Sequence, residues 1–318
     1  MRRAPWYIGR GNNELAAAFA TFFLVLVSPA AAAGGPDEIA RGAYLVTAAG
    51  CANCHTDSAH DGQPYAGGVA LATPFGTFYT PNITPDPETG IGRWTDAQFA
   101  RALREGVRPD GANYFPAFPY PSFTLITDAD ALAIKAYLFS LPAVRQPDRP
   151  HDLPFPVSWR LLQTGWKLLF FQPGPFRPAP GRSAAYNRGA YLVTALAHCG
   201  ECHTPRSPLG SPDPSGFLAG TPEGPDGKKV PNITQDKVTG IGNWSDADIL
   251  ALLKTGMTPD FNFVGGAMSE VVRDTAELTD DDRAAIAEYL ETVPPKPFAN
   301  QDWSKIHFEY WTPGFVPL

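Results

Sequence analysis

The chain has 318 residues, of which 44% are hydrophobic and 18% are charged, and its formal net charge at pH 7 is −7. This length and composition are those of a globular protein with enough residues for two domains of ordinary size. The acidic balance argues against nucleic acid as a partner and favours partners with basic docking faces.

The N-terminal segment, residues 1–33, has the layout of a secretory signal peptide. Arginines precede an apolar run from Leu15 through Val27, and Ala31-Ala32-Ala33 offers a cleavage site of small residues. The apolar run is short for a membrane span, which favours a cleaved signal over a retained anchor. We therefore predict export to the periplasm, where the protein could also associate with the cytoplasmic membrane.

Two five-residue segments contain all four cysteines: Cys51-Ala52-Asn53-Cys54-His55 and Cys199-Gly200-Glu201-Cys202-His203. C-x-x-C-H is the attachment signature of c-type haem, in which two thiols form thioethers with the porphyrin and the adjoining His ligates the iron. A dithiol redox motif would not need the His, and a zinc site would need both cysteine pairs around one ion. We predict two covalently attached haem c groups. The expected attachment residues are Cys51, Cys54, Cys199 and Cys202, and the expected iron ligands are His55 and His203.

The two segments lie in two copies of an internal repeat. The matching segments are 42–48 and 189–195, 81–84 and 231–234, and 89–94 and 239–244. The second and third pairs share one offset of 150 residues, so the copies can be aligned position by position.

Helices are predicted in each copy from caps and apolar spacing, beginning with one from Pro36 to Val46. The expected N-caps are Thr95, Thr127, Ser245 and Thr279, and the expected stops are Gly106, Pro142, Gly256 and Pro294. No stretch has the period-2 alternation of an extended sheet. We therefore predict a mainly α fold.

The expected organisation places a connector between two haem domains. The predicted boundaries are a first haem domain at 34–145, a Pro-rich connector at 146–183, a second haem domain at 184–296 and an aromatic C-terminal tail at 297–318. The connector contains a short apolar helix candidate from Trp159 to Phe171. It could contact a membrane surface or a partner, or it could pack between the two domains, which we favour. The tail is expected to fold back onto the domains.

The two copies differ where the second axial ligand of the iron is expected. Met268, in the loop before the final helix, is predicted to ligate the second iron. The equivalent position at the 150-residue offset is Phe118, which cannot ligate iron. The first haem is therefore five-coordinate or uses a ligand that the repeat does not predict. The candidates are His60, His151, His198, Tyr114 and Tyr120.

Three sequence features resemble the cytochrome c subunit of membrane-associated alcohol and gluconate dehydrogenases and related diheme cytochromes. They are the run from Thr73 to Thr84, the Thr-Gly-Ile-Gly-x-Trp boxes and the run from Tyr114 to Pro121. The resemblance implies two tandem cytochrome c-type haem domains. It also implies a periplasmic carrier that takes electrons from a periplasmic dehydrogenase and passes them to quinone or a respiratory cytochrome.

This chain departs from those subunits in two ways. Their Pro-Ala-x-Pro-Tyr loop typically carries an axial Met, whereas this chain has Phe118, and they usually have three haem domains rather than two. No predicted substrate pocket has its own acid–base pair, so we expect an electron-transfer protein with no catalytic residues. The alternatives are a diheme peroxidase-like oxidoreductase that uses an open first haem, and a small-ligand sensor.

Overall fold

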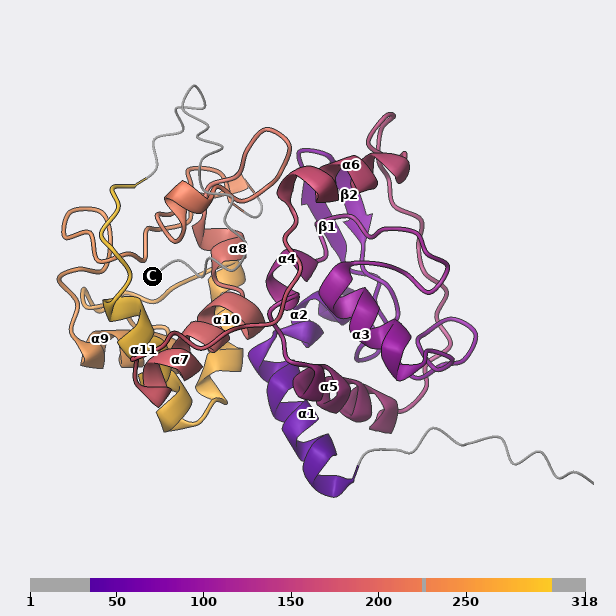
Figure 1. The fold of residues 1–318 in the computed structure, drawn as a ribbon, viewed down its shortest axis with the longest axis horizontal. Coiled ribbons are helices and arrows are strands. Elements are labelled where there is room, and N and C mark those ends of the chain that lie inside the picture. Colours follow the sequence, from indigo (N-terminus) through magenta and orange to yellow (C-terminus); the bar gives the residue numbers. More distant parts are fainter. Residues whose placement is uncertain (1–34, 225–226, 299–318) are drawn as a thin grey trace, which may run out of the picture. The chain divides into compact units, whose positions relative to one another are not determined.

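The computed structural model describes residues 35–224 and 227–298, which belong to one compact unit (Figure 1). We refer to residues 35–145 as the first half and to residues 184–298 as the second half. The predicted signal peptide and most of the predicted aromatic tail lie outside the described residues.

The described residues form helices, one small sheet and long loops. The first half contains α1 (Pro36–Ala48), α2 (Cys51–His55), η1 (Ser58–His60), β1 (Ala70–Thr73), β2 (Gly76–Tyr79), α3 (Asp96–Glu105), α4 (Tyr120–Phe123) and α5 (Asp128–Ser140). The connector carries α6 (Leu161–Phe170). The second half contains α7 (Ala184–Tyr191), the π-helix η2 (Leu192–Leu196), α8 (Gly200–His203), η3 (Pro214–Gly216), α9 (Asp246–Thr255), α10 (Ala267–Ala276) and α11 (Asp280–Glu291). The mainly α prediction is confirmed.

The helix ends follow the predicted capping chemistry. The Thr95 hydroxyl accepts from the Gln98 backbone N–H at 3.2 Å, and the Gln98 side chain accepts from the Thr95 N–H at 3.0 Å. Ser245 and Asp248 form the same capping box at the start of α9. Gly106 ends α3 in the left-handed region with φ 61°, where a side chain would be strained.

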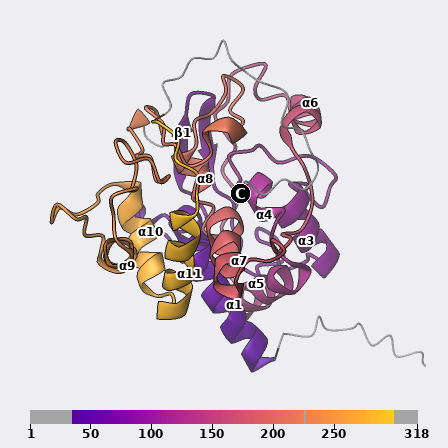
Figure 2. The same ribbon diagram turned by 60° about the vertical axis from the view of Figure 1, so that its left-hand side comes forward.

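The same helix pair forms the base of each half. Helix α1 packs against α5, and α7 packs against α11 (Figures 1 and 2). A Cβ atom at Gly42 would lie 1.9 Å from the Ala133 carbonyl oxygen, and one at Gly189 would lie 1.8 Å from the Ala285 carbonyl oxygen. Only glycine permits these crossings, which explains why it recurs at the same place in both copies.

One strand pair was not expected from the sequence. Strands β1 and β2 form an antiparallel hairpin in which Ala70 pairs with Tyr79. The Thr77 N–H donates to the Asp152 carbonyl at 2.8 Å, and the Asp152 N–H donates back to Thr77 at 2.9 Å, so the connector covers one edge of the hairpin. Strands of four residues are too short for alternation to be visible in the sequence, and this hairpin is not the extended sheet that the sequence argued against.

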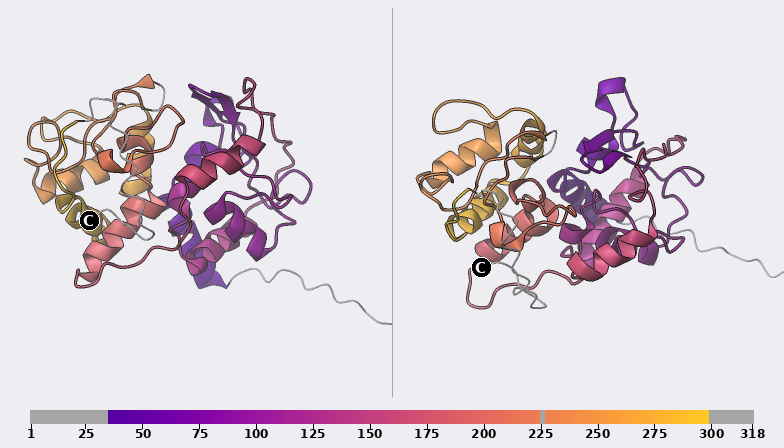
Figure 3. Two further views of the ribbon diagram at one scale, coloured as in Figure 1. Left: turned by 45° about the horizontal axis from the view of Figure 1, so that its top comes forward. Right: turned by 90° about the horizontal axis from the view of Figure 1, so that it is seen from above.

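The connector runs from the first half to the second (Figure 3). The Trp166 ring of α6 lies 6.3 Å from that of Tyr120 in the first half, and its Nε1–H donates to the Leu209 carbonyl of the second half at 2.9 Å. The helix therefore contacts both halves with one face, as we favoured. None of the described helices combines the length and the apolar character that a membrane span requires.

Candidate functional site: two haem-attachment segments

Each cysteine pair lies on or beside a single helical turn. Helix α2 contains Cys51 and Cys54, and α8 begins immediately after Cys199 and contains Cys202. Residues three positions apart lie on the same face of a helix, so both thiols of a pair can reach one edge of a flat ligand. The residue before each pair, Gly50 or His198, has a positive φ of 59° or 39°. Each turn therefore starts at an abrupt change of chain direction.

The histidine after each pair is held in the tautomer that a metal needs. Nδ1 of His55 lies 2.8 Å from the Pro81 carbonyl oxygen, and Nδ1 of His203 lies 2.8 Å from the Pro231 carbonyl oxygen. Because a carbonyl only accepts, Nδ1 carries the proton and the Nε2 lone pair is free. Burial lowers the pKa of both imidazoles, and the hydrogen bond to the carbonyl only partly offsets this effect. The lowered pKa favours the neutral imidazole, which is the form that ligates a metal.

The repeated Pro-Asn-Ile-Thr segment fixes that carbonyl. The Asn82 side chain accepts from the Thr84 N–H at 2.9 Å and donates to the Val144 carbonyl at 2.7 Å. Asn232 accepts from Thr234 at 2.8 Å and donates to the Lys296 carbonyl at 2.7 Å. In the sequence, these segments served only to align the two copies. Their recurrence at one offset was the signal for this supporting role.

The thiols do not have the properties of a dithiol redox pair. Burial raises the pKa of both Cys51 and Cys199 to about 12, whereas redox-active and metal-binding cysteines have lowered thiol pKa values. Within residues 35–224 and 227–298, no three His, Cys, Asp or Glu side chains are grouped so that they could hold a metal ion. The described residues therefore provide no shared zinc site, and these two thiols lack the lowered pKa of a dithiol redox pair.

The two positions that the sequence predicts on the distal sides, Met268 and Phe118, lie in different local structures. Met268 is half-buried and lies in the first turn of α10, not in a loop as expected, because the chain from Ala267 onward forms a helix of its own. Phe118 lies just before α4, with its ring 5.4 Å from the Tyr114 ring and 5.8 Å from the Phe123 ring. Phe118 therefore packs between two other aromatic rings.

Each of the three histidine candidates for the first iron has its Nδ1 in a hydrogen bond. His60 is exposed, with Nδ1 2.9 Å from the Asp57 carboxylate. Nδ1 of His198 lies 2.7 Å from the Leu196 carbonyl oxygen. Nδ1 of His151 accepts from the Tyr79 N–H at 3.1 Å, so its proton is on Nε2 and that nitrogen has no lone pair for iron.

The two candidate tyrosines are placed differently. Burial raises the pKa of Tyr114 to about 12, and its ring packs beside Phe118. Tyr120 is fully buried among described residues, and its hydroxyl has no hydrogen-bond partner there. Its ring lies 5.1 Å from the Phe171 ring of the connector. Burial therefore disfavours the phenolate of both side chains, which is the form of tyrosine that ligates iron.

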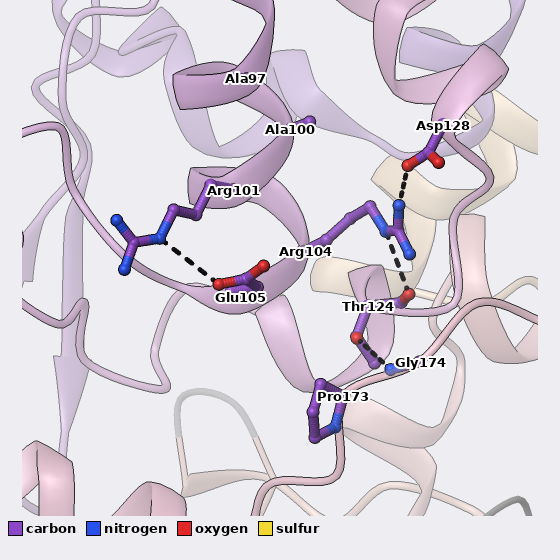
Figure 4. Close-up of a pocket in the computed structure, with 9 residues that line it drawn as sticks. All are labelled: Ala97, Ala100, Arg101, Arg104, Glu105, Thr124, Asp128, Pro173 and Gly174. Atoms are coloured by element: carbon purple, nitrogen blue, oxygen red, sulfur yellow. Dashed lines mark hydrogen bonds and ion pairs between the residues drawn. The ribbon is translucent and has the colours of Figure 1, made fainter.

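A surface hollow of about 420 Å³ lies between α3, the start of α5 and the connector (Figure 4). Its lining includes Arg101 and Arg104, but each is paired: Arg101 with Glu105 at 3.4 Å, and Arg104 with Asp128. The hollow contains neither a cysteine nor a histidine. Its two carboxylates, Glu105 and Asp128, are the partners of those arginines.

The chain has two cysteine-bearing turns, and each ends in a histidine whose Nδ1 is hydrogen-bonded and whose Nε2 is unprotonated. This arrangement is typical of proteins that attach two haem c groups. The family model for cytochrome c matches residues 39–142 and 186–294. The chain belongs to the cytochrome c family. It carries two covalently attached haem c groups on a fold of tandem cytochrome c domains, and it is an electron-transfer protein rather than an enzyme.

Curated relatives support this assignment. The chain is 46% identical over 267 residues to a diheme cytochrome c-type protein of Cereibacter sphaeroides, covering 82% of this chain and 88% of the relative. It is 42% identical over 301 residues to the cytochrome c subunit of alcohol dehydrogenase (quinone) of Gluconacetobacter polyoxogenes, covering 90% of this chain and 63% of that subunit. It is also 42% identical to the fructose dehydrogenase cytochrome subunit of Gluconobacter japonicus, covering 86% of this chain and 56% of that subunit.

Proposed function

We propose that this protein is a periplasmic diheme carrier that takes single electrons from a periplasmic dehydrogenase and passes them to quinone or a respiratory cytochrome. The observation that carries the proposal is the presence of two complete attachment turns, each with an anchored histidine, in one compact unit. The relatives whose names join a cytochrome subunit to a dehydrogenase support the choice of donor.

The residues that hold the cofactors are part of the proposal. Cys51 and Cys54 attach the first haem and Cys199 and Cys202 the second, while His55 and His203 ligate the irons from the proximal side. Met268 ligates the second iron from the distal side. When bound, the haems supply reversible one-electron chemistry. The protein orients the two imidazoles, excludes water and sets the distal environment.

The proposed location rests on the N-terminal sequence, which lies outside the described residues. Residues 1–33 act as a cleaved signal peptide, so that haem attachment takes place in the periplasm. No nucleic acid is involved in this function.

The connector supplies a surface for peripheral association with the cytoplasmic membrane or with the partner enzyme. Apolar side chains on and before α6 are exposed: Phe155 by 83%, Trp159 by 53%, Leu161 by 61%, Leu168 by 77% and Leu169 by 55%. Trp166 on the other face is held by Leu209, so the exposed face is presented by a fixed helix. A helix that is amphipathic in this way is suited to an interface between water and lipid.

The electron-carrier proposal can be tested with the purified holoprotein. Oxidised protein is mixed with periplasmic extract and with ethanol, fructose or gluconate, the substrate classes that the relatives' names suggest. Reduction of the haem absorption bands by one substrate, absent in heated extract, is the expected result. Reduced protein should then be reoxidised by a soluble ubiquinone analogue or by a mitochondrial-type cytochrome c. Failure of both the reduction and the reoxidation arms would overturn the proposal.

A further inference from the structure

The two halves exchange the same contacts across their interface. The Tyr44 hydroxyl of the first half donates to Asp282 Oδ2 of the second half at 2.5 Å, and it accepts from the Thr279 N–H at 3.2 Å. The Tyr191 hydroxyl of the second half donates to Asp130 Oδ2 of the first half at 2.6 Å. It accepts from the Thr127 N–H at 3.2 Å.

These contacts join equivalent positions of the repeat. Tyr44 and Tyr191 occupy the same place in the two copies of the Gly-Ala-Tyr-Leu-Val segment, and Asp130 and Asp282 are each three residues after the cap of α5 or α11. The crossing therefore resembles the self-complementary contact of a two-fold dimer, formed within one chain. The matching crossed packing of α1 with α10 and of α4 with η2 supports this arrangement.

Each carboxylate is also bound by an arginine of its own half. Arg41 Nε donates to Asp130 Oδ1 at 2.9 Å, and Arg188 Nε donates to Asp282 Oδ1 at 2.8 Å. The Asp130 side chain is 3% exposed and that of Asp282 is 12% exposed. Charge-assisted bonds to a buried carboxylate are strong, and the loss of one donor leaves part of that charge unsatisfied.

The same crossing reaches the attachment turns. Asn53, inside the first C-x-x-C, donates to Asp274 of α10 at 2.6 Å. Glu201, inside the second, accepts from the Ser122 hydroxyl of α4 at 2.6 Å. The Phe123 ring of α4 lies 5.2 Å from the ring of His198, which precedes Cys199. Each attachment turn therefore lies against the other half, and both cysteine-bearing turns face the interface.

We propose that Tyr44 and Tyr191, with Asp282 and Asp130, form a clasp that fixes the two attachment turns relative to one another and thereby sets the rate of electron exchange between the two haems. The step is a one-electron exchange in which one iron is oxidised from ferrous to ferric as the other is reduced from ferric to ferrous. No bond forms and no proton moves. The rate of electron tunnelling falls steeply with the distance between the two haems, so an interface that holds this distance fixed favours exchange. The two tyrosines act as positioning residues.

This inference rests on the proposed function, and it is tested on the holoprotein with Tyr44→Phe, Tyr191→Phe and the double variant. The control is Tyr186→Phe, which removes a hydroxyl from a ring that packs on Tyr289 within the second half. Haem content is measured first. Exchange is then followed after pulse-radiolytic reduction, and the distance between the two ferric irons is measured by pulsed EPR.

The double variant should slow the exchange at least ten-fold and broaden the distribution of iron–iron distances. Each single variant should give a smaller change, and Tyr186→Phe should give none. An unchanged rate and distance distribution in a double variant that retains both haems would overturn the clasp. Should the double variant lose haem, the single variants and Ser122→Ala provide the same two measurements.

The outcomes separate this inference from the electron-carrier proposal. Rapid reduction and reoxidation by external partners with no exchange between the haems in the unsubstituted protein would overturn the clasp alone. The opposite result would be exchange that depends on the clasp in a protein that the extract does not reduce and that neither quinone nor cytochrome c reoxidises. That result would overturn only the choice of partners.

Discussion

The two halves of the molecule are alike around the histidines proposed as proximal ligands and unlike at the positions proposed for the distal side. The His55 and His203 contacts to a proline carbonyl are the same length, 2.8 Å, and the same asparagine network supports both. At the positions proposed for the distal side, Phe118 precedes the four-residue α4, whereas Met268 is the second residue of the ten-residue α10. Attachment requires one fixed geometry, while the distal side can vary and so adjust the potential of each haem separately.

The largest effect is expected from removing one attachment turn. Cys51→Ala/Cys54→Ala should leave a protein with only the second covalent haem, and Cys199→Ala/Cys202→Ala should leave only the first. The reason is that no other cysteine exists to form the thioethers. Covalent haem per chain, measured by the pyridine haemochrome method and by intact mass, should fall from two to one. Retention of two haems in either variant would contradict the assignment.

The difference between Met268 and Phe118 can be removed by substituting either residue. Met268→Ala should convert the second haem to high spin and lower its potential by a sizeable part of the ~0.8 V range that axial ligands span. Phe118→Met should shift the first haem in the opposite direction. EPR spectra and redox titrations of the two variants measure both effects. The ligand assignment fails if Met268→Ala keeps its low-spin signal, and Leu290→Ala, a buried core change in α11, controls for general loosening of the second half.

The equivalent glycines at the two helix crossings should respond equally. Gly42→Ala and Gly189→Ala each place a methyl group against a carbonyl oxygen, and each should lower the free energy of unfolding by about 3 kcal/mol, the upper part of the range for overpacking. Gly165→Ala in α6 is the control, because nothing lies within 4 Å of its added Cβ. Thermal and urea unfolding provide the values. A neutral result at only one crossing would show that the two halves tolerate strain differently.

Much of the fold could be predicted from local sequence signals. Caps at Thr95 and Ser245, the glycine stops and the duplicated segments each act over a few residues, so they could be identified without coordinates. The cysteine and histidine pattern similarly predicted two haem groups. The β1–β2 hairpin and the start of α10 could not be predicted in this way, because they are short elements held by tertiary contacts such as Thr77 with Asp152.

The supporting part of the site could not be predicted because its partners are distant or belong to the backbone. Tyr44 and Asp282 are 238 residues apart in the chain, and no local pattern links them. The acceptor for His55 is a proline carbonyl, which leaves no trace in the side-chain sequence. Only the recurrence of these segments at matching positions indicated that they had a role.

The smallest effect is expected in the acid stability of the second half. Burial raises the pKa of Asp282, but hydrogen bonds from Arg188 and Tyr44 outweigh it, so the net pKa lies below the ordinary value of 3.8. A lowered carboxyl pKa contributes stability above the unfolded pKa, and this contribution is lost as the pH falls through the folded value. Asp282→Asn should therefore lower the melting temperature at pH 7 and make its decline below about pH 4 shallower than in the unsubstituted protein. Asp281→Asn, at the exposed neighbouring position, should leave both features unchanged. Equal slopes for Asp282→Asn and the unsubstituted protein would mean that the carboxylate contributes no net charge stabilisation to the interface.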